Sequence, residues 1–122
     1  LNPETNLRLE AFTTDTGIID DYRVGRAPFE NASISRIYFG KAVTEIESGA
    51  FAQKYQLTKV EFEDGSNIDI PDSAFAYCTS LTQVVFPQYV YSIGDNAFYQ
   101  ADLSQTEYLP SSLAKIGNNA FA

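Results

Sequence analysis

The apolar residues of this chain recur at a nearly constant spacing. The dipeptide Ala-Phe occurs four times, and its successive phenylalanines lie 24, 23 and 23 residues apart. These residues are Phe51, Phe75, Phe98 and Phe121. The weaker match Ala27-Pro28-Phe29 continues the series 22 residues towards the N-terminus. Because a period of roughly 20 to 50 residues is typical of stacked repeats, the pattern predicts a repeat protein.

Two other apolar landmarks accompany each phenylalanine. A valine or isoleucine precedes it by five residues each time: Val24, Ile46, Ile70, Ile93 and Ile116. A six-residue element follows it, apolar or mostly apolar at its first, fourth and sixth positions, and these elements begin at Ile34, Leu57, Leu81 and Leu103. All variation in length falls between the landmarks. Since loops absorb length changes and packed elements do not, the spacing predicts two loops per repeat.

Each six-residue element is expected to form a short β-strand. Its fourth and sixth positions alternate with polar ones, and β-branched or aromatic residues are common in it. The inward side chains of so short a strand form a continuous core only by stacking on the next repeat. The segments from Ile93 to Phe98 and from Ile116 to Phe121 are interpreted as a second extended piece, a turn and one helical turn. The phenylalanines are expected to fill the interior.

The unit over residues 81–98 resembles the BspA-like, or Treponema pallidum-type, leucine-rich repeat, whose consensus is LxxLxLPxxLxxIGxxAFxxCxxL. The resemblance covers about residues 24 to 122, and residues 75–81 match the AFxxCxxL part at every position. Lys54 and Ala101 replace the cysteine, and Thr106 replaces an apolar strand residue. Asn67 stands where Val43, Val90 and Leu113 stand in the other repeats. Thr106 and Asn67 are expected to weaken the stack.

The resemblance implies a strand-rich α/β fold. It predicts a right-handed leucine-rich-repeat solenoid with a short-stranded parallel sheet and about four to five repeats of 22–24 residues. We expect one domain, with repeats over residues 24–122 and an N-terminal cap or degenerate repeat over residues 1–23. Leu7 and Leu9 alternate with polar residues and Ile18-Ile19 follows a turn signal, which suggests two extended segments. The end of a preceding domain is the alternative for this segment.

Composition narrows the classes of function. The net charge is −8 and only eight residues are Lys or Arg, which argues against nucleic-acid binding. The chain has no apolar run long enough to span a membrane. It also has no positively charged start followed by an apolar stretch, the pattern of a signal peptide. It starts at Leu1 and lacks methionine, which we interpret as a processed or excised piece. The single cysteine, Cys78, excludes an internal disulfide and is expected to be a buried small apolar residue.

Catalytic chemistry and cofactors are not expected. The chain contains no histidine, which excludes Ser-His-Asp and Cys-His arrangements and histidine-ligated metal sites. The carboxylates of Glu61 and Glu63 are expected to be solvated, an environment that does not tune a carboxyl group for acid–base catalysis. The loop from Glu63 to Asp69 carries oxygen ligands around Gly65 without EF-hand spacing. A weak Ca²⁺ site and a solvated turn both stay open for this loop.

The outward positions of the predicted strands supply the candidate site. Stacking aligns the third and fifth positions of each strand into two columns on the open face of the sheet. The columns are Arg36, Lys59, Gln83 and Gln105, and beside them Tyr38, Glu61, Val85 and Glu107. The extended face of a solenoid is its usual binding surface. The alternative is a solvated face in which Lys59 and Glu61 screen one another. Tyr89 and Tyr91 are also expected to point outward.

The expected function is a non-catalytic protein–protein interaction module. By resemblance, it belongs to a cell-surface or secreted adhesin-like protein and binds a host or extracellular matrix protein through the open face. The alternative is a purely structural spacer in a larger surface protein. Leu113, Ile116 and Tyr108 lack a following strand to cover them. We therefore expect either that the natural protein continues past Ala122 or that the chain self-associates through this end.

Overall fold

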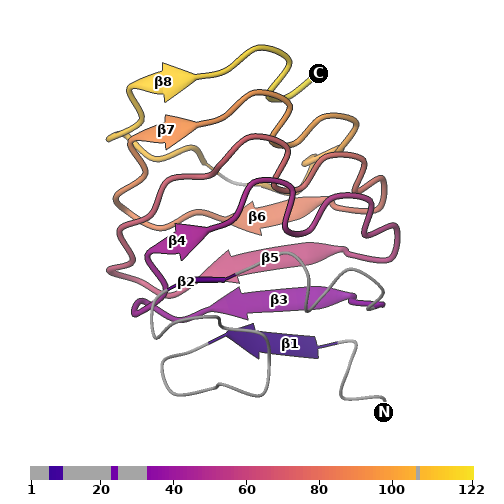
Figure 1. Ribbon diagram of the computed structural model, residues 1–122, viewed down its shortest axis with the longest axis horizontal. Coiled ribbons are helices and arrows are strands. Elements are labelled where there is room, and N and C mark those ends of the chain that lie inside the picture. The colour runs from indigo at the N-terminus through magenta and orange to yellow at the C-terminus, as the bar shows by residue number, and fades with distance from the viewer. Residues whose placement is uncertain (1–5, 10–22, 25–32, 107) are drawn as a thin grey trace.

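The computed structural model describes residues 6–9, 23–24, 33–106 and 108–122 (Figure 1). Regular structure in these residues consists of eight β-strands joined by turns: β1 (Asn6–Leu9), β2 (Arg23–Val24), β3 (Arg36–Phe39), β4 (Glu45–Ile46), β5 (Lys59–Phe62), β6 (Gln83–Val85), β7 (Ser92–Ile93) and β8 (Lys115–Ile116). The described residues contain no helix. The helical turn expected in the segments from Ile93 and Ile116, and with it the α part of the expected α/β class, is therefore wrong for this part of the chain. Hydrogen-bonded turns around each Ala-Phe pair occupy this position.

The main sheet is parallel and has the strand order β1-β3-β5-β6. Arg36 pairs with Lys59, and Lys59 pairs with Gln83, so that each strand is offset from its neighbour by one repeat. Figure 1 shows successive passes of the chain lying above one another in sequence order, and each pass from one sheet strand to the next is called a coil here. The sequence period is thus the length of one coil.

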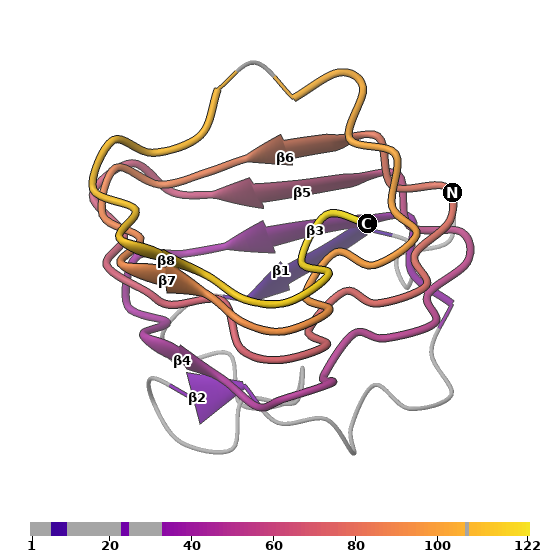
Figure 2. The ribbon, with the colours of Figure 1, turned by 90° about the horizontal axis from the view of Figure 1, so that it is seen from above.

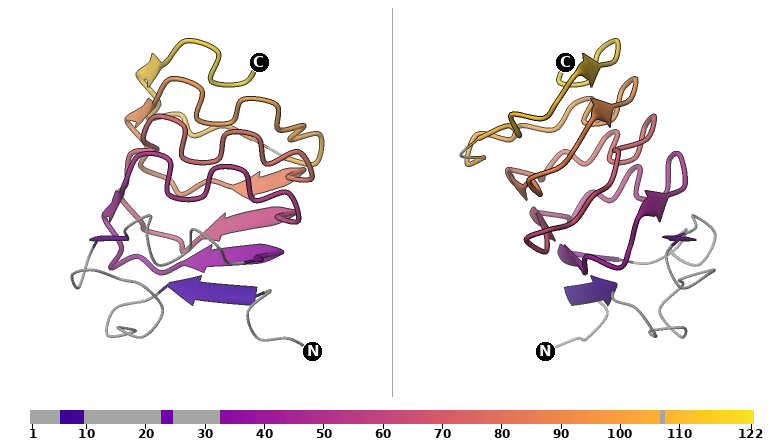
Figure 3. Two further views of the ribbon diagram at one scale, coloured as in Figure 1. Left: turned by 45° about the vertical axis from the view of Figure 1, so that its right-hand side comes forward. Right: turned by 90° about the vertical axis from the view of Figure 1, so that its left-hand side faces the viewer.

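The two-residue strands form a second wall opposite the main sheet. β2 pairs with β4 and β7 with β8, both parallel, and a bridge between Ile70 and Ile93 continues this ladder. Viewed from above, the main sheet lies along one side of the molecule and the short strands along the other (Figure 2). Two further views show the same walls in side view (Figure 3). The core fills the space between them.

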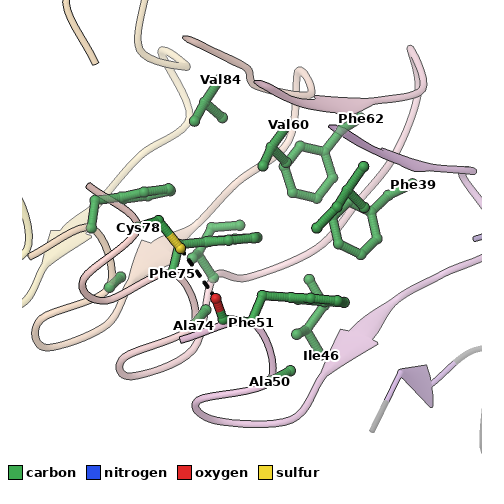
Figure 4. Close-up of a cluster of buried hydrophobic side chains, with 14 of the residues drawn as sticks. Phe39, Ile46, Ala50, Phe51, Val60, Phe62, Ala74, Phe75, Cys78 and Val84 are labelled. Atoms are coloured by element: carbon green, nitrogen blue, oxygen red, sulfur yellow. Dashed lines mark hydrogen bonds between the residues drawn. The ribbon is translucent and has the colours of Figure 1, made fainter. Parts of the chain in front are cut away.

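Stacked phenylalanine rings form the centre of this core. Phe51, Phe75, Phe98 and Phe121 follow one another with ring centroids 5.8, 5.5 and 5.6 Å apart and nearly parallel planes. The first three are fully buried. Phe39 and Phe62 stack beside them from the main sheet, at 4.8 Å (Figure 4). The expectation that the repeated phenylalanines form an interior stack is confirmed for Phe51, Phe75 and Phe98, whereas Phe121 continues the stack but is 38 % exposed.

The strand expected over residues 103–108 does not form in its described residues, 103–106 and 108. Residues 103–106 make a turn, and Leu103 adopts a φ of 55°. The hydroxyl of Thr106 accepts the backbone N–H of Val84 at 3.0 Å. A side-chain oxygen therefore occupies the position of a strand carbonyl, which ends the ladder at β6. Thr106 was expected to weaken the stack, and the ladder of the main sheet does end at β6, in the preceding coil.

The equivalence assigned to Asn67 is corrected by one residue. Asn67 is exposed, whereas Ile68 is buried and its N–H bonds the carbonyl of Tyr89. Ile68 therefore occupies the column of Val90. Only Asp69 separates Ile68 from Ile70, where two residues separate Val90 from Ile93. The Asp69 carboxylate accepts the N–H groups of both Tyr91 and Ser92, at 3.1 Å each, and so replaces the missing backbone.

The N-terminal region is described only in part. β1 pairs in parallel with β3, so an extended segment lies where Leu7 and Leu9 were expected to form one. The second expected segment, at Ile18-Ile19, and the match at residues 27–29 lie outside the described residues. The expected boundary between a cap over residues 1–23 and repeats over residues 24–122 stays a prediction.

Candidate functional site

The open face of the main sheet carries the predicted binding columns. Along β3, Ile37 and Phe39 are buried, whereas Arg36 is exposed and Tyr38 is half-buried. The same alternation holds in β5 and β6. The parallel register aligns Arg36, Lys59 and Gln83 in one column, and Tyr38, Glu61 and Val85 in the next. The structure therefore places six of the eight predicted residues side by side on one surface.

The last two predicted residues do not extend these columns as strand positions. Gln105 is exposed and lies in a turn, where its N–H bonds the carbonyl of Thr82. Glu107 lies outside the described residues. The columns are set by backbone pairing of β3, β5 and β6, and the pairing ends before Gln105.

The chemistry of the face is mixed. The Lys59 ammonium lies 3.7 Å from a Glu61 carboxylate oxygen, and their side chains are 33 % and 44 % exposed. An exposed ion pair of this kind contributes little to stability. Both groups therefore stay accessible to a partner. Arg36, Tyr38, Gln83 and Val85 add a guanidinium, a phenol, an amide and an apolar side chain. The face therefore offers hydrogen-bond donors, acceptors and apolar contact within one patch, as protein interfaces do.

A polar ladder beside the face is structural. The hydroxyl of Thr58 donates to the carbonyl of Ser35 at 3.0 Å, and that of Thr82 donates to the carbonyl of Thr58 at 3.5 Å. These bonds connect neighbouring coils where each sheet strand begins. The column of hydroxyl groups therefore supports the sheet.

The acidic loop from Glu63 to Asp69 uses its carboxylates for internal hydrogen bonds. A Glu63 oxygen accepts the backbone N–H of Lys41 at 2.9 Å, and Asp69 accepts two N–H groups from the next coil. Among the described residues, no three or more His, Cys, Asp or Glu side chains gather as a metal site. The geometry favours the turn over the Ca²⁺ site.

Cys78 lies in the core beside the phenylalanine stack. Its thiol donates to the carbonyl of Phe51 at 3.1 Å (Figure 4). Burial raises the pKa of the Cys78 thiol to about 12, and the nearby Lys54 only partly offsets this. A thiol held in this neutral form is a poor nucleophile and a poor metal ligand. The expectation of a buried, structural cysteine is confirmed.

Large apolar and aromatic side chains are exposed at two further places. Tyr89 and Tyr91 are 51 % and 57 % exposed on either side of the buried Val90, as predicted. The last coil exposes the side chains of Tyr108, Leu109, Ile116 and Phe121. For the last coil, the sequence predicted self-association as one of two possibilities. For Tyr89 and Tyr91, it predicted only that they point outward.

The side of the molecule beside the short strands has features that sequence reasoning missed. A hollow of about 680 Å³ is lined by β4, by residues 69–72 and by Ser92 and Gly94. A second hollow, of about 440 Å³, lies at the turns that contain Tyr77 and Tyr99. The sequence signal that could have located the second hollow is the set of residues that vary around each Ala-Phe pair, such as Tyr77 and Tyr99. These residues come together only through the geometry of the turns.

Comparison with known proteins agrees with this architecture. The family described as the BspA type leucine rich repeat region matches residues 6–122 in six copies. The chain belongs to this family. The number of repeats counted from the sequence spacing, four to five, is smaller than the number of matched copies and stays a prediction.

A solved structure also matches this leucine-rich-repeat chain. It is a leucine-rich cell surface protein from Faecalibacterium prausnitzii A2-165, with 20% sequence identity and a TM-score of 0.40. The match covers 97% of this chain and 45% of that chain. This chain therefore spans less than half of the matched protein. A search of curated proteins finds no match. Within the described residues, no helix has the length and apolar character needed to cross a membrane.

Proposed function

We propose that this leucine-rich-repeat chain is a non-catalytic module that binds a protein partner through the open face of its main sheet. The observation that carries the proposal is the register of β3, β5 and β6, which aligns six outward side chains of mixed chemistry in two columns. Interfaces of stable complexes combine such donors, acceptors and apolar contacts. Family membership supports a place on the cell surface or in the secreted fraction, with a host or extracellular matrix protein as the partner.

The proposal includes the shape of the binding surface. The coils form one right-handed solenoid, because crossovers between parallel strands of a sheet are almost always right-handed. The four strands of the main sheet, spaced by about 4.8 Å, span only about 15 Å from first to last. A stable interface needs a patch nearer 28 Å across, corresponding to roughly 800 Å² per partner. The face of this chain alone therefore binds weakly, and longer stacks bind more tightly.

The alternative is a spacer that holds other domains apart. A direct test measures binding of the chain to an array of purified extracellular matrix proteins, using Arg36→Glu and Tyr38→Ala. The control is Lys115→Glu, which makes the same charge change at an exposed strand residue on the opposite wall. A binding module loses affinity in the first two variants and keeps it in the third. A spacer shows no binding in any of them. Equal loss in Arg36→Glu and Lys115→Glu with no loss in Tyr38→Ala indicates a nonspecific charge effect.

We also propose that the last coil associates with a second copy of the chain. Ile116 is 53 % exposed, whereas Ile93, its partner in the β7–β8 pair, is 1 % exposed. Phe121 is 38 % exposed at the end of the ring stack. Sedimentation velocity over a range of concentrations tests this contact, with Ile116→Gln and Phe121→Ser as variants that weaken it. A wild-type chain that stays monomeric throughout contradicts it.

A further inference from the structure

The turns around each Ala-Phe pair present two more columns of side chains, on a surface separate from the sheet face. The residue before the alanine has a positive φ in each coil: Gly49, Ser73, Asn96 and Asn119. The residue two positions after the phenylalanine does so as well: Gln53, Tyr77 and Gln100. Because the same backbone conformation recurs at the same place in each coil, the side chains of a column leave the backbone in the same direction.

These turns are held rigidly. The N–H of Ser73 donates to the carbonyl of Asp95, and the N–H of Tyr77 donates to the carbonyl of Tyr99. One coil further on, Asn96 and Gln100 donate in the same way to Asn118 and Ala122. Side chains on such a backbone are positioned before any ligand arrives, which lowers the entropic cost of binding.

The hollow of about 440 Å³ lies among these turns and has no charged lining residue. Its lining is Ser73, Ala76, Tyr77, Asn96, Tyr99 and Asn119. The polar groups it offers are hydroxyls and side-chain amides, which both donate and accept hydrogen bonds without a formal charge.

Two tyrosines meet at this hollow, and both depart from the residues of their columns. Tyr99 stands where Ala52, Ala76 and Ala122 stand in the other coils, and Tyr77 stands where Gln53 and Gln100 stand. Their ring centroids are 5.3 Å apart and the rings are nearly perpendicular, at 85°. Tyr77 remains 45 % exposed. The repeated turns therefore set the backbone positions, and an aromatic surface occurs where Tyr77 and Tyr99 occupy two of them.

We propose that this hollow binds a neutral oligosaccharide. Sugar rings present C–H faces that pack on aromatic rings, and hydroxyl groups that pair with amides and hydroxyls. A charged ligand would find no countercharge in the lining and would be desolvated at a cost. Asn96 and Asn119 lie on adjacent coils, which are spaced by about 4.8 Å. This is close to the length of one sugar unit in an extended chain, so that successive units meet equivalent amides.

The test is a titration of the isotope-labelled chain, followed by two-dimensional NMR, with cellotetraose, maltotetraose, mannotetraose and chitotetraose. We expect at least one of the four to shift the amide signals of residues 73–77, 96–100 and 119–121 with a dissociation constant of about 1 mM or below. The sheet-face residues should not respond. Saturation transfer from the tyrosine rings to the sugar should identify the ring contact.

Two variants taken from the chain's own repeats test the tyrosines without disturbing the turns. Tyr77→Gln introduces the residue that its column holds at Gln53 and Gln100, and Tyr99→Ala introduces the one held at Ala76. Each is expected to weaken binding about tenfold through loss of ring contact. Tyr55→Gln, at a tyrosine that is 57 % exposed but does not line the hollow, is the control. The proposal is overturned if none of the four sugars binds at about 10 mM, if the shifts fall on the sheet face, or if the two variants bind as the wild type does.

Discussion

The carboxylate of Asp72 lies directly against Gly94 of the next coil. A Cβ atom built on Gly94 would lie 2.5 Å from the backbone nitrogen of Asp72 and 2.8 Å from the carbonyl carbon of Pro71. The same carboxylate accepts the N–H of Asp95 at 2.7 Å. Asp95 and Gly117 repeat the arrangement one coil later, where Asp95 accepts the N–H of Asn118. The glycine after the repeated isoleucine therefore gives the aspartate of the previous coil room to approach the backbone.

Gly94→Ala is expected to destabilise the chain by about 2 to 3 kcal/mol, because backbone atoms of the previous coil have to move to make room. Urea denaturation measures this loss. Gly65→Ala is the control: Gly65 has a φ of 89°, unlike Gly94, and a Cβ there meets only the Cδ atom of Lys41, at 4.0 Å. It is expected to cost about 1 kcal/mol from backbone strain alone. Equal costs at the two sites would show that the close approach does not matter.

Asp69→Ala is expected to cost about 1 to 2 kcal/mol, because it leaves the N–H groups of Tyr91 and Ser92 without their acceptor. Asp69→Asn retains a side-chain oxygen and is expected to recover most of the loss. Thermal unfolding of the three proteins measures the difference. If the asparagine variant is as unstable as the alanine variant, the carboxylate acts through its charge and not as a replacement for missing backbone.

Phe75→Ala is expected to cost about 3 to 5 kcal/mol, because it opens a cavity between two stacked rings. Phe121→Ala is expected to cost much less, since among the described residues that ring stacks on Phe98 alone, and it is 38 % exposed. Urea midpoints compare the two variants. Similar losses at both sites would contradict a stack in which neighbours on both sides matter.

The stability that Cys78 contributes is expected to fall at high pH. The pKa of its thiol is raised to about 12 in the folded chain, whereas an exposed thiol ionises near pH 8.5. The folded state therefore keeps a proton that the unfolded state loses, and the contribution is complete below about pH 8.5 and declines towards pH 12. The difference in unfolding free energy between the wild type and Cys78→Ala should shrink between pH 8 and 10. Because other groups titrate equally in both proteins, a constant difference would show that the thiol ionises normally.

The amino-acid sequence alone was enough to predict the repeat, its length, the buried phenylalanines and the outward columns at Arg36 and Tyr38. Each of these follows from the spacing of apolar residues, because a side chain that recurs once per coil meets its equivalents when coils stack. The family resemblance followed from the same spacing.

The places where the regular stack changes become visible only in the folded chain. A count of residues does not show that the Thr106 hydroxyl takes a strand carbonyl's place, or that Asp69 replaces a missing residue and shifts Ile68 into the column assigned to Asn67. Nor does it show that Tyr77 and Tyr99 meet at one hollow. These outcomes depend on hydrogen bonds and ring contacts between residues about 22 positions apart. The local sequence fixes which groups are available, and the packing of one coil on the next selects which of them pair.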